Sequence, residues 1–240
     1  MRATSQPFQG ATAFLRLLQL TSPAFPTGAF AYSQGLETAV ERGWASDVSS
    51  LREWLLGVLE CSLARTDLPL IALGCTVWDA VPTGELTDQE ATAAVVSLSA
   101  RVLATRETRE LREEERQVGR ALARVLASQG LAEASFFKGH AQASFIVLYA
   151  LALSRWRLSV TDGLAAFCFA WLENQLAAAS RLMRLGQLDA QSVLAEIMVE
   201  IPALCLGSLA VTPEDIGGTL PAHALASSLH EQQYSRLFRS

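Results

Sequence analysis

The sequence of 240 residues contains a single lysine, Lys138, and the residue that follows it is glycine. A P-loop needs lysine followed by serine or threonine, so the chain has no Walker-type nucleotide site. It also lacks the GxSxG, HExxH and GxGxxG patterns of common hydrolases, metalloproteases and dinucleotide-binding proteins. Any nucleotide chemistry in which the chain takes part must therefore belong to a partner protein.

Cysteine and histidine are few and scattered. No CxxC pair exists, and the four cysteines lie far apart within apolar segments: Cys61, Cys75, Cys168 and Cys205. We therefore expect buried, reduced thiols. Metal-ligand spacing is absent from the three histidines, which are His140, His223 and His230. We expect no metal or other cofactor in this chain.

Charge is also scarce, at 18% of residues, and the net charge of −5 argues against a general nucleic-acid-binding surface. The longest apolar runs, Phe145–Leu153 and Leu164–Leu172, are shorter than the roughly 18 residues that a membrane span needs. Met1–Gly10 has no signal-peptide pattern. We expect a cytoplasmic protein that binds neither nucleic acid nor membrane.

Hydrophobic residues make up half of the chain, and leucine and alanine dominate while β-branched residues are sparse. This composition favours helix. The mean hydropathy of +0.25 is high for a monomer without a membrane span. Because surplus apolar surface needs a cover, we expect a homodimer with the 160–185 or the 145–153 helix at its interface.

Capping signals and apolar periodicity predict helices along most of the chain. Asp67 is expected to cap one of them, and Pro202 to kink or divide the last. The expected helices cover residues 14–21, 32–42, 50–59, 67–79, 87–105, 105–129, 135–153, 160–185 and 191–209. We predict an all-α, single bundle-like domain of about eight to ten helices over residues 12–226. A flexible segment, 1–11, precedes it, and a partner-binding tail, 227–240, follows.

The segment Thr105–Gln129 is the clearest amphipathic helix. One face collects arginines and the opposite face collects leucine and valine. The arginine face is either a solvated surface with ion pairs to nearby glutamates or a dock for an acidic partner. Glu107 is expected on the apolar side, where a carboxylate needs a partner. The arginines of this face are Arg106, Arg109, Arg112, Arg116 and Arg120.

The stretch Leu20–Glu41 combines a loop rich in proline and glycine with a helix that begins near Tyr32. Pro26 and Gly28 exclude helix and central strand from the loop. Apolar residues between them indicate that the loop packs against the body. On spacing alone, a packed loop that leads into a capped helix is the favoured interpretation.

Four segments carry a family resemblance. Residues 26–37 read Pro-x-Gly-x-Phe-x-Tyr-Ser-Gln-Gly-Leu-Glu, which resembles the N-terminal signature of the urease accessory protein family UreF. Residues 106–114 resemble a second segment of the family. Residues 178–187 resemble a third, with a basic residue at Arg181 but no proline near Arg184. Asp215–Gly218 and His230–Ser240 resemble the C-terminal segment, so the matches keep their order along nearly the whole chain.

The resemblance implies a non-enzymatic helper in nickel delivery to urease. UreF-like proteins form all-helical dimers, bind the accessory protein UreD (also called UreH), recruit the GTPase UreG and act on apo-urease. Nickel and GTP would then be handled by partners. We assign structural roles to Pro26, Gly28, Gly35 and Glu107. Partner-binding roles are assigned to Tyr32, Gln34, Glu37, Asp67, Arg106, Arg109, Arg181, Tyr234, Arg236 and Arg239.

Two other functions stay open. A small hydrolase could use Glu37, Asp67 and His140, although these residues belong to separate expected helices. An unrelated helical scaffold or ligand-binding regulator would instead contain a deep apolar pocket. The C-terminal tail is expected to be mobile or loosely docked in the free protein and to become ordered on a UreD-like partner. That ordering would bury Tyr234, Leu237 and Phe238.

Overall fold

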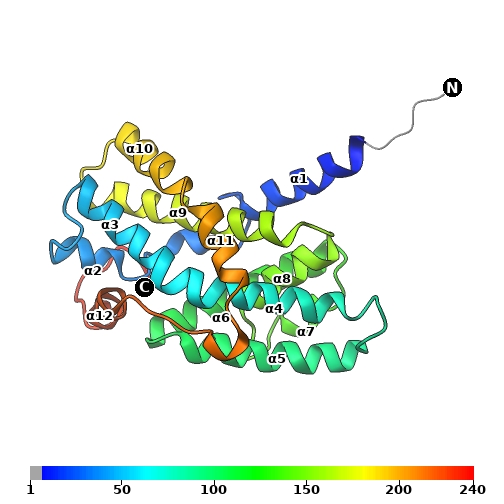
Figure 1. The fold of residues 1–240 in the computed structure, drawn as a ribbon. Helices are drawn as coiled ribbons and strands as arrows, with labels where there is room; N and C mark the ends of the chain where they lie inside the picture. The colour runs from blue at the N-terminus through cyan, green and yellow to red at the C-terminus, as the bar shows by residue number, and fades with distance from the viewer. Residues whose placement is uncertain (1–6) are drawn as a thin grey trace.

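The computed structural model describes residues 7–240, and all regular structure within them is helical (Figure 1). The expected all-α domain is confirmed. The α-helices are α1 Pro7–Thr21, α2 Leu36–Glu41, α3 Val48–Val58, α4 Leu68–Asp79, α5 Asp88–Thr105, α6 Arg109–Ser128, α7 Ala134–Phe137, α8 Phe145–Arg155, α9 Val160–Leu182, α10 Gln187–Met198, α11 Ile201–Leu209 and α12 Pro221–His230. The remaining turns are the 3-10 helices η1 Ala29–Ala31 and η3 Pro213–Asp215 and the π-helix η2 Leu59–Asp67.

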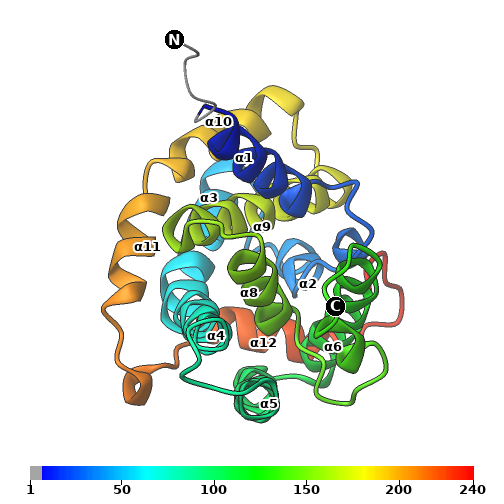
Figure 2. The same cartoon turned by 90° about the vertical axis from the view of Figure 1, so that its right-hand side faces the viewer.

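Helix α8 lies at the centre of the bundle, with α4, α5, α6 and α9 around it (Figure 2). Its residues 146–153 are at most 2% exposed. An apolar helix of this kind is stable only when every face is covered, and neighbouring helices of the same chain supply that cover. The expectation that Phe145–Leu153 contributes to a dimer interface is therefore wrong, because the core of one chain already takes up these side chains.

Helices α3, η2 and α4 follow one another without a break. We call this continuous stretch, residues 48–79, the α3–α4 rod. It begins at Val48 rather than Ser50, because Asp47 is the N-cap: its side chain accepts from the backbone N–H of Ser50, and the two residues form a capping box. Asp67 caps nothing, since it has helical backbone angles in the middle of the rod. At the start of α5, near the expected residue 87, Thr87 and Glu90 form a capping box.

The π-helix η2 is held from outside by the loop that follows η3. The Gly217 N–H donates to the carbonyl of Arg65 at 3.1 Å, and the Thr66 hydroxyl donates to the carbonyl of Gly218 at 3.3 Å. A Cβ atom on Gly218 would lie 2.5 Å from the Cys61 carbonyl oxygen, so a side chain cannot be accommodated there. The loop that carries the Asp215–Gly218 motif thus binds one backbone carbonyl and one side chain of the π-helix.

Two expected helices differ from the prediction, one in its start and the other in its continuity. The 105–129 segment becomes helical at Arg109, because the Thr108 side chain accepts from the Leu111 N–H and caps α6. Glu107 therefore lies before the helix and is exposed, which corrects its expected place on the apolar face. The 135–153 segment is broken between α7 and α8, and the side chain of Ser144 caps α8.

The 32–42 helix is also shorter than expected. Tyr32 is extended, Gln34 and Gly35 have left-handed backbone angles, and α2 then runs from Leu36 to Glu41. At the N-terminus, residues 7–11 of the expected flexible segment are helical in α1, and residues 1–6 lie outside the described part of the chain. The last expected helix is divided into α10 and α11, as predicted from Pro202, the second residue of α11.

The α10–α11 stretch, Gln187–Leu209, is long and apolar enough to cross a membrane by length and composition alone, and 33% of its most apolar window is buried. This stretch of 23 residues is longer than the uninterrupted apolar runs Phe145–Leu153 and Leu164–Leu172 of the sequence. Helix α11 lies along the edge of the bundle, and α1 projects from the body towards the N-terminus (Figures 1 and 2).

We predict that Gly35→Ala destabilises the fold strongly. Gly35 has φ = 82°, and a Cβ atom there would lie 2.9 Å from the Ser227 backbone nitrogen in α12. Gly28→Ala is the matched control, because Gly28 has φ = 78° but nothing within 4 Å. We expect losses of about 1 kcal/mol for the control and about 3 kcal/mol for Gly35→Ala in urea unfolding. Equal losses would show that the α2–α12 contact tolerates an added methyl group.

Candidate functional site

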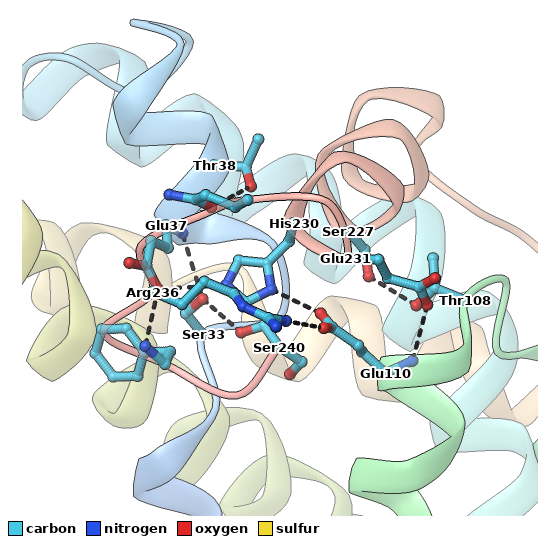
Figure 3. Close-up of polar contacts among 12 residues, drawn as sticks. Ser33, Glu37, Thr38, Thr108, Glu110, Ser227, His230, Glu231, Arg236 and Ser240 are labelled. Carbon is cyan, nitrogen blue, oxygen red and sulfur yellow. Dashed lines mark hydrogen bonds and ion pairs between the residues drawn. The ribbon is translucent and has the colours of Figure 1, made fainter.

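The candidate site is the region where the C-terminal tail, residues 231–240, passes between α2 and α6 (Figure 3). The Glu37 carboxylate accepts from the backbone N–H groups of Leu237, at 2.6 Å, and Phe238, at 2.8 Å. The Ser240 carbonyl accepts from both the N–H and the hydroxyl of Ser33, at 2.8 and 2.6 Å. One short segment at the start of α2 therefore holds the tail by the backbone groups of three of its residues, Leu237, Phe238 and Ser240.

His230 connects the two helices beneath the tail. Its ring is fully buried, with Nδ1 2.6 Å from a Glu110 oxygen and Nε2 3.3 Å from a Glu37 oxygen. Arg236 forms an ion pair with the second oxygen of Glu110, and Glu231 accepts from the Glu110 backbone N–H at 3.1 Å. The carboxylates of α2 and α6 are thus joined through side chains of α12 and the tail.

The tail is docked, which corrects the expectation of a mobile or loosely held segment. Phe238 is 5% exposed and Ser240 is buried, whereas Tyr234 and Leu237 lie in solvent. The ordering entropy is offset by hydrogen bonds to carboxylates together with the burial of Phe238. Composition of the tail alone could not reveal this, because Glu37 lies 200 residues away from the amides that it binds.

Glu114 extends the network towards α9. Its oxygens accept from the Gln34 side-chain amide at 2.7 Å and from the Ser240 hydroxyl at 2.8 Å. Gln34 in turn accepts from the Trp171 indole N–H at 2.7 Å. Burial raises the pKa of Glu114 to about 7, against the opposing effect of the two hydrogen bonds.

A second buried network pins η2, α6 and α8 together. The Arg106 guanidinium lies between Asp67, at 2.8 Å, and Glu115, at 2.7 Å. Glu115 also accepts from the Ser144 hydroxyl and the Ile146 N–H. Burial works to lower the pKa of Arg106, but the two carboxylates raise it well above its ordinary value, so the guanidinium stays charged. Burial raises the pKa of Asp67 despite that neighbour.

A cavity of about 140 Å³ separates the two networks, with Asp67 and Glu114 in its wall. His223 also lines it, and among the described residues neither of its ring nitrogens has a hydrogen-bond partner of normal geometry. Burial lowers the pKa of this histidine and favours the neutral ring. Aromatic and aliphatic side chains form the rest of the wall, including Phe145, Tyr149, Phe167 and Trp171.

The three residues considered for a hydrolase belong to different surroundings. Glu37 binds the tail, Asp67 binds Arg106, and His140 stacks against Phe136 in the loop after α7, with ring centroids 4.6 Å apart. Within residues 7–240 no group of three histidine, cysteine, aspartate or glutamate side chains is arranged to hold a metal ion.

The structure divides the predicted partner-binding residues into two sets. Arg109, Arg181, Tyr234 and Arg239 are exposed, and Arg236 is exposed although it pairs with Glu110. The others take part in the networks above or, like Tyr32, whose hydroxyl donates to Gln117 at 2.9 Å, are buried beside them. Buried members can act on a partner by shaping the surface, and their assignment stays a prediction. Sequence reasoning missed four buried residues of the networks: Glu110, Glu114, Glu115 and His230.

Comparisons with known proteins show the family of this chain. The family model described as UreF matches residues 45–198, more than half of the chain. The urease accessory protein UreF of Alkalilimnicola ehrlichii is 44% identical over 225 residues, 94% of this chain and 95% of that protein. Those of Marinomonas sp. and Teredinibacter turnerae are 42% and 43% identical over 226 residues each, which covers 94% of this chain and 94% and 98% of theirs.

The helical fold and these similarities define the class of protein, an accessory protein of urease maturation. Both the extent of the family match and the identity to near full-length relatives go beyond a shared motif. The chain belongs to the UreF family.

We predict that Glu114 makes stability fall as pH rises. Its pKa is about 7 in the folded protein against an ordinary value of 4.5. The folded state therefore binds the proton more tightly, and this stabilisation is complete below pH 4.5 and lost as pH rises through 7. A shift of this size corresponds to at most roughly 3 kcal/mol.

The test compares urea unfolding of the wild type and of Glu114→Gln between about pH 5 and pH 8, the range in which the raised pKa of Glu114 changes its protonation. The difference in unfolding free energy between the two proteins isolates the contribution of Glu114. The variant should gain stability relative to the wild type as pH rises. The lowered pKa of His223 acts in the opposite sense, but this residue is present in both proteins and cancels in the difference. A difference that does not change with pH would refute the assignment.

Proposed function

We propose that this chain is a non-enzymatic chaperone of the cytoplasm that binds a UreD/UreH-like protein and recruits a UreG-like GTPase to apo-urease. In this proposal nickel and GTP are bound by the partners. The observation that supports it best is the tail, which presents Tyr234, Leu237 and Arg239 to solvent while buried carboxylates hold its backbone in place.

Exposed aromatic and arginine side chains on an ordered backbone are typical of interface hot spots. Tyr234 is completely exposed and Leu237 is 60% exposed, so neither contributes to the core of its own chain. A backbone fixed before binding lowers the entropic cost of association. The tail is therefore suited to be read by a partner, and the polar network beneath it sets its shape.

Deletion of residues 233–240 should leave the helical body folded and abolish recruitment of the GTPase by the complex with the UreD-like protein. Glu37→Gln should weaken recruitment without removing any tail residue, because an amide has one acceptor oxygen for the two backbone N–H groups. Glu113→Gln is the matched control, since Glu113 is an exposed acid on α6.

Co-purification of the three proteins measures recruitment, and amide exchange of the tail measures its order. Normal recruitment by the deleted chain would overturn the role of the tail. Failure of the wild-type chain to bind the UreD-like protein would overturn the proposed function itself.

We also propose a homodimer in which α1 of each copy packs on the other. Helix α1 exposes Phe14, Leu15 and Leu18 at 60%, 62% and 50%. Phe14 and Leu18 form one wall of an apolar groove whose other walls are the outer side of α9, including Phe169, and the start of α11. The exposed apolar side chains of α1 in one copy can therefore fill the groove of a second copy, and a two-fold axis makes this contact reciprocal.

The double variant Phe14→Arg/Leu18→Arg should shift the chain from dimer to a monomer of 25.9 kDa in light scattering. Leu188→Arg is the control for an added charge on an exposed leucine, because Leu188 is 86% exposed on α10 and does not line the groove. A wild-type chain that is already monomeric at high concentration would contradict the dimer.

A further inference from the structure

Helix α6 carries a row of arginines on its outer face, at the edge of the bundle beside the C-terminal tail (Figure 2). We call it the arginine row; it consists of Arg109, Arg112, Arg116, Arg120 and Arg124. Successive members are three or four residues apart, so they share one side of the helix. At 1.5 Å per residue the row is about 22 Å long. It is a concentrated positive surface on a chain whose net charge is −5.

The acids of α6 leave this charge largely uncompensated. Glu110, Glu114 and Glu115 are directed inward and are bound by His230, Gln34 and other partners of the two networks. The fourth acid, Glu113, pairs with Arg116 at 2.9 Å and is half exposed. Five guanidinium groups thus share one exposed carboxylate on their own helix.

Three arginines of the row are tethered in place by backbone carbonyls. Arg112 donates from Nη1 to the carbonyl of Arg106 at 2.7 Å. Arg116 and Arg120 donate from Nε to the carbonyls of Ala141 and His140 in the loop before α8, at 3.2 and 3.4 Å. Each of these bonds uses one of five N–H donors, and Arg116 uses another for Glu113, so every one of the three keeps donors for a ligand. The side chains have lost freedom before any partner arrives, which lowers the entropic cost of binding.

We propose that the arginine row is a docking surface for an acidic segment of a partner protein, whose carboxylates pair with the tethered guanidinium groups. Guanidinium binds carboxylate through two parallel hydrogen bonds, which a lysine cannot do. Carboxylates three or four residues apart on a helix are 5–6 Å apart, which matches the spacing of the row. Arg239 of the tail adds a further guanidinium near the middle of α6, where it reaches Gln117.

A protein partner fits better than a polyphosphate surface. The net charge of −5 repels nucleic acid and anionic lipid over the rest of the molecule. A partner protein needs to approach only at the row, and arginine is enriched at the centres of protein interfaces. The proposal identifies the ligand by its chemistry and does not depend on the urease partners named above.

The test uses the full chain and a fluorescently labelled poly-glutamate peptide, with binding followed by anisotropy at low and physiological salt. The triple variant Arg112→Gln/Arg116→Gln/Arg120→Gln should bind about tenfold more weakly or worse. The matched control is Arg42→Gln/Arg157→Gln/Arg184→Gln, which removes the same charge from exposed arginines elsewhere. Its affinity should stay within about twofold of the wild type, because exposed charges far from the ligand are screened.

A third variant replaces the same three arginines by lysine and keeps the charge of the row. It should bind several-fold more weakly than the wild type, since lysine cannot form two parallel hydrogen bonds to a carboxylate while also donating to the loop carbonyls. The tethers also hold the loop before α8, so unfolding curves are measured for every variant. If the triple variant unfolds, Arg109→Gln/Arg124→Gln replaces it, because these two are exposed, and weaker binding is again expected.

Three outcomes would overturn the proposal. One is an equal loss of affinity in the Arg42/Arg157/Arg184 control, which would mean that net charge alone attracts the peptide. Another is undiminished binding by the lysine variant, which would show that positive charge suffices and that the guanidinium geometry plays no part. The third is tighter binding of duplex DNA or of phosphatidylserine vesicles than of poly-glutamate. Loss of peptide binding in the row variants with normal GTPase recruitment would support the row as a separate site.

Discussion

The packing of this protein depends on the three carboxylates that α6 directs into the interior. A buried carboxylate costs several kcal/mol unless it is paired, so each one requires partners at fixed positions. Glu110 takes them from α12 and the tail, Glu114 from Gln34 and Ser240, and Glu115 from Arg106 and the start of α8. Segments from both ends of the chain are thereby tied to one helix.

This arrangement gives α6 two polar faces with opposite tasks. The inner face is acidic and binds other parts of the chain, while the outer face is basic and its arginines are steadied by loop carbonyls. A simple division into an apolar and a solvated face misses this, because leucine and valine share the inner side with glutamate. The helix is both an organiser of the fold and a surface with its own chemistry.

Much of the helical fold could be predicted from local signals. The Thr87–Glu90 capping box and the division near Pro202 depend on neighbours within a few residues, and both are present in the structure. Errors arose where a distant group decides. Asp67 has the features of a cap, but it faces Arg106 from inside a continuous rod.

The candidate site was harder to predict because its contacts join residues far apart in the sequence. Glu37 was singled out through the family resemblance, yet its ligands, two backbone amides of the tail, carry no signal in residue type. Glu107 was placed wrongly for a smaller reason: α6 begins two residues after it, and this shift moves the side chain out of the helical pattern. Three neighbouring glutamates of α6 occupy the interior instead.

The π-helix within the α3–α4 rod has a consequence for how the family can vary in length. A π-helical turn holds more residues than an α-helical one, so removing one residue between Leu59 and Asp67 would let the rod relax to plain α-helix. Because the wide π turn already absorbs the extra residue, α3 and α4 would keep nearly the same relative orientation after such a deletion, whereas a deletion within α3 or α4 would turn every residue beyond it by about 100°. The change would be local to η2, where the Arg65 carbonyl and the Thr66 hydroxyl bind the loop at Gly217 and Gly218. Changes of length within this rod should thus be confined to η2.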